Sequence, residues 1–349
     1  MLFRSYDFVP RKAKRDGLRP TEDYKKYNWV LISEDANADN AEVLALTKES
    51  SILPVLNMKS FSYAPERLGW GDPNNGSLAA DGQYITVQRD DHPIFKALQK
   101  NRGSKIQVLS KIEEKGLMPI DIDLPGTHSL ATSLMRAKDD YYGSGDPQTF
   151  LHEVPAGMRG GKKYICMPIA ISSSKNLTTP GKDLIVAVVN YLLSSEPSIQ
   201  IPQLQITSFT INGIAGKIDG EANKIIFEID LAEHTDIDKF AIAPQVTIAS
   251  DYTHVTPASG ETIDFSESWS YPVAYEVSDF INRRVYDVAI RFYSSEGIED
   301  VYAVGDWVNI YDIFGRKVST TNEDIYRMVL PRGIYIIVTE TGETFKIMR

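Results

Sequence analysis

The sequence predicts a chain of three parts: an α/β domain with a mainly parallel sheet, an all-β sandwich and a small all-β module. In residues 1–196, apolar strand-like runs alternate with helical patterns, which is typical of α/β domains. Residues 204–293 contain short strand patterns separated by turn residues, as in an antiparallel sandwich. Residues 298–349 are also rich in strand patterns and include a hairpin signal.

The strands and helices of the first part follow from its apolar runs. Residues 29–33 (WVLIS) and 52–58 (ILPVLNM) are continuous apolar runs, as expected of strands buried on both faces. Asp39 precedes a helical pattern over residues 41–47 and can cap it. Further strands are predicted at residues 84–87, 106–109 and 163–171, and a closing amphipathic helix at residues 182–193. We therefore expect a parallel sheet with helices packed on it.

Turn signals divide the rest of the chain. Residues 212–213 (NG), 219–220 (DG) and 257–260 (PASG) separate the predicted strands of the sandwich. Residues 194–203 (SSEPSIQIPQ) are rich in Ser and Pro and predict a linker in front of it. The third part has about 50 residues, which supports only a marginal core, so we expect it to pack on its neighbour.

Charge and composition exclude several classes of protein. The net charge of -10 arises beyond Glu196, where 12 basic residues face 23 acidic ones, whereas 25 face 24 up to that point. Nucleic acid is therefore not an expected partner, because its phosphates would be repelled. The chain has no run of about 18 apolar residues, so no transmembrane helix is predicted. A single cysteine, Cys166, allows no intrachain disulfide and no Cys-based zinc site.

Four segments of the first part, TEDYKKYNWVLISED, ILPVLNMKSF, DDHPIFKAL and GGKKYICMPIA, follow one another in the order of a known family. On these segments, residues 21–193 resemble the ThuA-like branch of the class I glutamine amidotransferase-like proteins. The resemblance implies a flavodoxin-like fold for residues 1–196. The family's first strand and helix have no counterpart before Tyr27, and residues 1–20 lack the apolar core of a signal peptide. We therefore expect either a truncated start or a branch that has lost this element.

The other two parts carry motifs of bacterial surface proteins. The segments INGIAGKIDGEANKIIFEIDL, PQVTIAS, VTPASGETIDFS and VAYEVSD, followed by RRVYDVAI, resemble Ig-like or cadherin-like sandwich modules of such proteins. The motifs VNIYDIFGRKV and LPRGIYIIV, in this order at the end of the chain, resemble the C-terminal sorting domain of type IX secretion substrates. That second resemblance implies export across the outer membrane and an interaction with the secretion machinery.

An amidotransferase would need a cysteine nucleophile on the sharp turn after the strand at residues 52–56. The four residues of this turn, NMKS, include no cysteine. Cys166 instead lies in the middle of a predicted strand, where apolar surroundings raise the pKa of a thiol. We interpret Cys166 as a buried structural thiol, and Cys-dependent amide hydrolysis is not expected.

Other residues could form a catalytic site in the first part. Ser60, in the turn, could act as a nucleophile with His92, His128 or His152 as its base, although spacing selects none of the three. Lys59 precedes Ser60 in the same turn. An enzyme would require titratable groups such as Lys59, His92 and His152 to converge in the fold.

Two of these histidines have alternative interpretations. His92 lies at the end of a predicted strand, where open α/β sheets bind ligands, but it can equally cap a helix that starts at Pro93. His152 and Glu153 could belong to an acid–base site. They do not form the zinc motif H-E-x-x-H, because Ala156 stands where the second histidine would be. No metal site and no cofactor are predicted.

Aromatic and acidic side chains in the first part suit a sugar or another small molecule, because rings stack on apolar sugar faces and carboxylates accept hydrogen bonds from hydroxyl groups. The predicted ligand-binding residues are Asn57, Trp70, Asp91, Tyr141 and Tyr142. Core packing is the alternative for Trp70. Asp121 and Asp123 would share one face of a strand, as a carboxylate pair or as a solvated edge.

The sequence thus favours a secreted or cell-surface protein whose non-catalytic α/β domain binds a small molecule or a glycan. One alternative is a hydrolase, acting on carbohydrate or another substrate, that uses a histidine and an acid in the α/β domain. The other is a purely structural surface protein.

Overall fold

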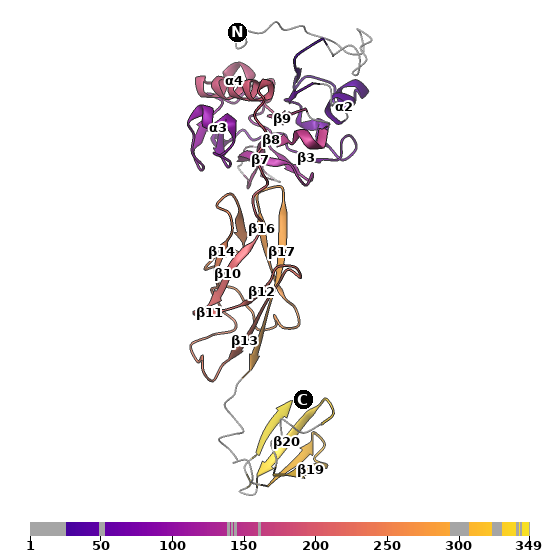
Figure 1. Ribbon diagram of the computed structural model, residues 1–349, viewed down its shortest axis with the longest axis vertical. Coiled ribbons are helices and arrows are strands. Elements are labelled where there is room, and N and C mark those ends of the chain that lie inside the picture. The colour runs from indigo at the N-terminus through magenta and orange to yellow at the C-terminus, as the bar shows by residue number, and fades with distance from the viewer. Residues whose placement is uncertain are drawn as a thin grey trace. The chain divides into compact units, whose positions relative to one another are not determined.

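The computed structural model describes most of the chain. The described residues are 26–48, 53–137, 140, 142, 145–159, 162–293, 307–322, 330–339, 342 and 344–348. The chain divides into two compact units, whose elements are labelled in Figure 1. The first comprises Met1–Thr207, Val246–Ser259 and Tyr275–Val285, and the second comprises Ser208–Gln245, Gly260–Ala274 and Tyr286–Arg349. The division therefore passes through the β-sandwich and not in front of it.

One nine-stranded sheet forms the centre of the first unit. Its main path runs in the order β1-β2-β9-β8-β7-β4-β5, while β6 pairs with both β8 and β3. The strands are β1 (Val30–Ile32), β2 (Val55–Asn57), β3 (Gly71–Pro73), β4 (Tyr84–Val87), β5 (Lys105–Gln107), β6 (Ile120–Ile122), β7 (His128–Leu134), β8 (Pro147–Val154) and β9 (Tyr164–Cys166).

The prediction of a flavodoxin-like α/β domain with a mainly parallel sheet is wrong. Among the described strands of this sheet, only the pairs β1–β2 and β2–β9 are parallel. The other pairs of this sheet, from β9 through β8, β7 and β4 to β5 and along β3 and β6, are antiparallel. An apolar run identifies a buried strand but not its direction, because buried parallel and antiparallel strands can carry the same residues.

The long strands β7 and β8 explain most of this difference. Neither is a continuous apolar run, since β7 reads HSLATSL and β8 reads PQTFLHEV, yet both are largely buried. Their polar side chains bond across the sheet: Ser129 Oγ lies 2.9 Å from Thr149 Oγ1, and Gln88 Nε2 donates to Thr132 Oγ1 at 2.9 Å. Buried hydroxyl groups with partners cost little, so a Ser- and Thr-rich strand can form the interior.

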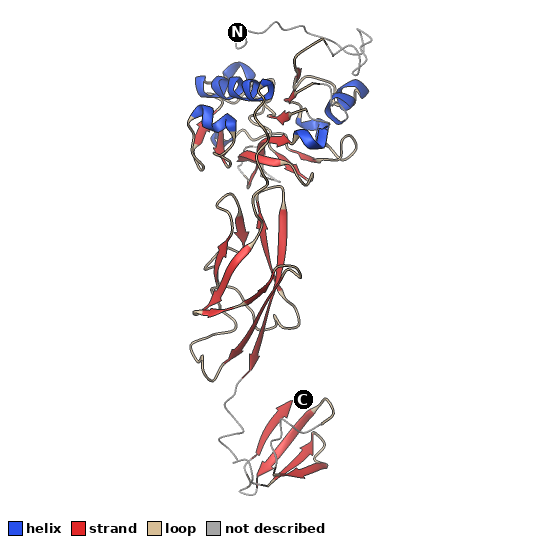
Figure 2. Cartoon of the chain, in the orientation of Figure 1, coloured by secondary structure: helices blue, strands red, loops and turns tan. Residues whose placement is uncertain are grey.

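Helices are sparse. In the ranges that the structure describes there are three α-helices: α2 (Ala41–Lys48), α3 (Pro93–Leu98) and α4 (Thr179–Leu193), drawn in blue in Figure 2. Thr178 caps α4 by accepting from Gly181 N at 3.0 Å. At its other end Lys163 Nζ donates to the carbonyl oxygens of Tyr191 and Ser194, at 2.7 and 2.9 Å. A cation at a helix C-terminus stabilises the last carbonyl groups. None of these helices is long and apolar enough to cross a membrane.

Two hydrophobic clusters lie on the two faces of this sheet. Neighbouring residues of β9 show the alternation: Ile165 belongs to the cluster that includes α3 and α4, whereas Tyr164 and Cys166 belong to the other. Successive side chains of a strand point to opposite faces. By the same rule the adjacent residues His152 and Glu153 of β8 point to opposite faces, where they meet Tyr63 of one cluster and Tyr191 of the other.

Residues 194–203 are not the free linker that their composition predicts. Ser198 Oγ donates to Glu153 Oε1 at 2.9 Å, and Arg89 Nη2 donates to the carbonyl oxygen of Gln200 at 2.8 Å. Ile199 packs against the cluster around α4. The segment is therefore part of the first unit.

Two sheets form the β-sandwich. Their orders are β11-β10-β14 and β12-β13-β17-β16-β15. The strands are β10 (Ile206–Ile211), β11 (Ile214–Ala215), β12 (Lys217–Asp219), β13 (Lys224–Asp230), β14 (Gln245–Ile248), β15 (His254–Thr256), β16 (Val273–Ser278) and β17 (Arg283–Tyr293). Phe209 of β10 and Phe227 of β13 meet edge to face, with ring centroids 5.8 Å apart. The pair β13–β17 runs parallel, where the sequence predicts antiparallel strands only.

The last strands form a small antiparallel sheet in the order β19-β18-β20-β21. They are β18 (Val308–Asp312), β19 (Lys317–Thr321), β20 (Ile334–Thr339) and β21 (Thr344–Met348). Val308, Ile310 and Ile337 are fully buried and supply its core.

Candidate functional site

Glu153 of β8 is the centre of a buried polar network in the first unit. Its Oε1 atom accepts hydrogen bonds from Tyr191 of α4 at 2.7 Å and from Ser198 at 2.9 Å, and its Oε2 atom lies 3.4 Å from His92 Nε2. Burial by itself raises the pKa of Glu153, but the hydrogen bonds from His92, Tyr191 and Ser198 outweigh it and leave the pKa below its ordinary value. The carboxylate is thus held in its charged form inside the protein.

His92 is the cap of α3, as one of its two sequence interpretations predicts. Its Nδ1 atom accepts from Ile94 N at 3.2 Å, and Pro93 occupies the first turn of the helix. Burial lowers the pKa of His92, although Glu153 opposes this. Both ring nitrogens are therefore engaged, one with the helix and one with Glu153. Because the side chains of His92 and Glu153 are 0% exposed, the pair can hold a proton but does not present it to solvent.

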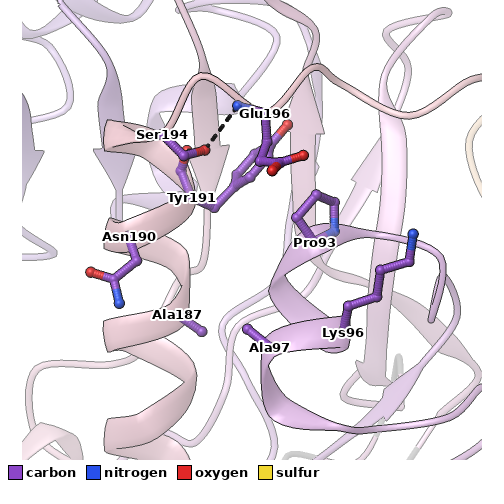
Figure 3. A pocket seen from close by; sticks show the side chains of 8 residues that line it. All are labelled: Pro93, Lys96, Ala97, Ala187, Asn190, Tyr191, Ser194 and Glu196. Carbon is purple, nitrogen blue, oxygen red and sulfur yellow. Dashed lines mark hydrogen bonds between the residues drawn. The ribbon is translucent and has the colours of Figure 1, made fainter.

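A shallow groove of about 360 Å³ lies beside this network, between α3 and α4. Figure 3 shows its lining side chains, with Tyr191 at one end and Lys96 at the rim. Neither His92 nor Glu153 lines it. The groove therefore does not open the buried acid–histidine pair to a substrate.

His152 lies on the other face of the sheet. Its Nε2 atom is 2.6 Å from Tyr63 OH, and Nδ1 has no partner among the described residues. Complete burial lowers the pKa of His152 to about 3, so the ring is neutral. Cys166 is its cross-strand neighbour, and burial raises the pKa of that thiol. The interpretation of Cys166 as a buried thiol is confirmed.

The turn after β2 is held by internal hydrogen bonds. Asn57 Nδ2 donates to Tyr164 OH at 2.8 Å and to Ser62 Oγ at 3.0 Å, and Asn57 Oδ1 accepts from Lys59 N at 2.8 Å. Lys59 Nζ bonds the carbonyl oxygen of Glu34 at 2.5 Å. Ser60 Oγ is buried and has no hydrogen-bond partner among the described residues. Ser60 is therefore not bonded to a histidine.

Of the candidate catalytic residues in the described part of the chain, His92 and Glu153 meet as a buried pair, whereas Lys59, Ser60 and His152 have other neighbours. His92 contacts Glu153, His152 contacts Tyr63, and Lys59 contacts Glu34. His152 and Glu153 are adjacent on β8 and face opposite sides. In the described part of the chain, no group of three or more His, Cys, Asp or Glu side chains could hold a metal ion.

The predicted ligand-binding residues are also dispersed. Trp70 packs edge to face against Tyr63 and Tyr164, with centroids 5.6 and 6.1 Å away. Asp91 accepts two hydrogen bonds from Arg89, at 2.9 and 2.8 Å. Tyr142 is 70% exposed, and Tyr141 lies outside the described residues. Asn57 serves the turn described above.

A different set of side chains is presented to solvent in the second unit. Trp269 is 53% exposed, Tyr271 77% and Phe240 60%. Trp269 and Tyr271 lie in a turn before β16. Phe265 N donates to Lys239 O at 2.9 Å, which joins this turn to the segment that carries Phe240. We call residues 236–240 and 261–271 together the aromatic platform.

The turn that carries Trp269 and Tyr271 is held in place by hydrogen bonds of buried residues. Phe265 and Ser268 are buried. Ser268 Oγ donates to Phe265 O at 2.7 Å and accepts from Ile290 N of β17 at 3.2 Å. Tyr271 N donates to Glu267 O at 2.9 Å. The turn is therefore built to hold Trp269 and Tyr271 outward, although burying them would remove much apolar area from water.

Sequence reasoning missed this site. Its only local signal is SESWSYP, in which two aromatic residues alternate with small polar ones in front of a proline. Such a segment fits neither a strand with one apolar face nor a helix, so the sequence does not assign its aromatic residues to a hydrophobic core.

Comparison with known proteins bears on the same region. Residues 206–290 match the family model described as "SGBP, N-terminal", where SGBP stands for surface glycan-binding protein. The match runs from the start of β10 into β17 and includes the whole aromatic platform. These residues are therefore similar to a module of surface glycan-binding proteins. Among curated proteins, no relative of the chain is found.

Proposed function

We propose that this protein binds glycans at the cell surface and that its aromatic platform contacts the sugar. The match of residues 206–290 to the surface glycan-binding family model carries this proposal. The exposed rings of Trp269 and Tyr271 support it, because they lie inside the matched region.

The chemistry of the platform suits a sugar. The C–H faces of a pyranose or furanose ring are apolar, and they lose contact with water when they lie on an aromatic face. At roughly 25 cal/mol per Å² of apolar area, even one stacked ring contributes on the order of 1 kcal/mol. Because the turn is already anchored through Ser268, little loop ordering opposes binding.

The nine-stranded sheet has a supporting role in this proposal. Its buried network joins α3, α4 and β8. Of its candidate catalytic residues, His92 and Glu153 meet but are 0% exposed, and His152 contacts Tyr63 instead. The C-terminal sheet contains the motif VNIYDIFGRKV in β18 and β19, and we propose that it carries the protein to the outer surface through the secretion machinery.

The test is affinity electrophoresis and glycan-array binding with the full chain. We expect at least one polysaccharide to retard the protein or retain it on the array. The control is Phe314→Ala, which removes an aromatic side chain that is 77% exposed on the C-terminal sheet, and it should bind as the wild type does. If no glycan is bound by the folded protein, the proposed function is wrong.

A further inference from the structure

We infer that the aromatic platform recognises the interior of an uncharged polysaccharide chain, not a chain end and not an acidic glycan. This inference rests on the proposed function and adds the class of ligand. It follows from the exposure of the platform's aromatic side chains, from the charges around them and from their spacing along the turn.

The exposures favour contact with a chain that continues on both sides. Trp269, Tyr271 and Phe240 are each more than half exposed, so they are not enclosed by other side chains. Recognition of a chain end needs a pocket that surrounds the terminal sugar and pairs its extra hydroxyl group. Rings on an open turn contact one face of each sugar and leave the chain free to run past them.

The charges on the platform disfavour an anionic ligand. Its two segments contain five carboxylates, Asp236, Asp238, Glu261, Asp264 and Glu267, and a single basic residue, Lys239. A hydrogen bond from the Ser266 backbone lowers the pKa of Asp264, so this carboxylate stays ionised at neutral pH. Glycans with uronate or sulfate groups would meet this negative field within about 10 Å, the screening length at 0.1 M salt.

Lys239 does not reverse this balance. Its ammonium group lies over the Phe240 ring, 5.2 Å from the ring centre. The positive charge of Lys239 is therefore engaged with the face of that ring. The carboxylates around the rings can instead accept hydrogen bonds from neutral sugar hydroxyl groups, as Asp264 and Glu267 flank the turn that carries Trp269.

The spacing of the rings predicts a dependence on chain length. Trp269 and Tyr271 are two residues apart, so their Cα atoms are separated by at most about 7 Å, which is the scale of one or two sugar units. Each added sugar that reaches another ring adds stacking area. Affinity should therefore rise with the length of the oligosaccharide until both rings are covered.

The experiment uses the full chain and isothermal titration calorimetry. The probes are neutral polysaccharides (α- and β-glucans, mannan, fructan), acidic ones (polygalacturonate, alginate, chondroitin sulfate), and a length series of oligosaccharides from the best neutral polymer. We expect binding of a neutral polymer only, an affinity that rises from disaccharide to longer oligomers, and no effect of reducing or capping the chain end. Trp269→Ala and Tyr271→Ala should each weaken binding at least tenfold, whereas Phe314→Ala should not.

A charge variant separates the two parts of the inference. Glu267→Lys reverses the charge of an exposed side chain of the platform, so acidic polymers should gain measurable affinity relative to the wild type. Wild-type binding of an acidic polymer, loss of binding on end capping, or neutral binding that survives Trp269→Ala with Tyr271→Ala would overturn the inference and leave the proposed function standing. Absence of binding to every polymer would instead remove the proposed function itself.

Discussion

His92 Nε2 lies 3.4 Å from Glu153 Oε2, and both side chains are 0% exposed. Because His92 Nδ1 accepts from Ile94 N, the proton of the neutral ring is on Nε2 and is donated to Glu153. Tyr191 of α4 donates to the same carboxylate. One buried carboxylate thus ties the start of α3 and the end of α4 to the central sheet.

Glu153→Gln should reduce the acid sensitivity of the fold. The folded pKa of Glu153 lies below its ordinary value of 4.5, so its carboxylate stabilises the protein above that pH, and this contribution is lost as the pH falls through the folded pKa. Glutamine has no carboxylate to protonate, so the variant lacks this pH-dependent contribution to stability. We expect Glu153→Gln to cost about 1–3 kcal/mol at pH 7 and to show a shallower decline below about pH 4.5, measured by urea denaturation at several pH values.

The control for this comparison is Glu221→Gln, which changes an exposed carboxylate of the β12–β13 turn. It should leave the free energy of unfolding at pH 7 within about 0.5 kcal/mol of the wild type. Equal stability of Glu153→Gln and Glu221→Gln at pH 7 would show that the buried network contributes nothing to the fold.

His152→Gln should flatten the stability profile at a higher pH. The unfolded state takes up a proton on this histidine below its ordinary pKa of 6.5, whereas the folded state does so only near 3. The free energy of unfolding therefore decreases as the pH is lowered from about 6.5 towards 3, by up to about 1.4 kcal/mol per pH unit. Glutamine does not titrate and can still bond Tyr63. Guanidinium denaturation at pH 7 and pH 5 should show a smaller difference for the variant; an unchanged difference would contradict the prediction.

Lys163→Met should destabilise the C-terminal end of α4. The variant removes the hydrogen bonds from Nζ to the carbonyl oxygens of Tyr191 and Ser194 while keeping most of the apolar stem. We expect a loss of about 1–3 kcal/mol in the free energy of unfolding. Lys182→Met, on the exposed side of the same helix, is the matched control and should change little. Similar losses in both variants would mean that charge in general, and not this contact, is responsible.

Ser268→Ala should weaken glycan binding without touching a ring. It removes the acceptor for Ile290 N and the donor to Phe265 O, which hold the turn under Trp269 and Tyr271. We expect the Kd for the bound polysaccharide to rise several-fold in calorimetry, with the β-sheet circular dichroism retained. Ser195→Ala changes an exposed serine outside the aromatic platform and should bind normally. Unchanged binding by Ser268→Ala would mean that the anchor does not position the rings.

Several elements could be predicted from local patterns alone. The apolar runs at residues 29–33 and 52–58 contain β1 and β2, and the closing helix pattern lies within α4. The proline after His92 indicated the helix cap that the structure shows. These strands, this helix and this cap depend mainly on residues that are close in the chain, so local sequence patterns can predict them.

The sequence by itself determined where several strands lie, that Cys166 is buried and that the second half is rich in β-structure. Only the tertiary structure decided the direction of the strands, the burial of the Ser- and Thr-rich strand β7, and the separation of His152 from Glu153 onto two faces. It also decided that Trp269 and Tyr271 point outward. The physical reason is that strand direction, the hydrogen bonding of buried polar groups and side-chain exposure depend on residues distant in the chain. The periodicity of a segment does not show which distant segment packs against it.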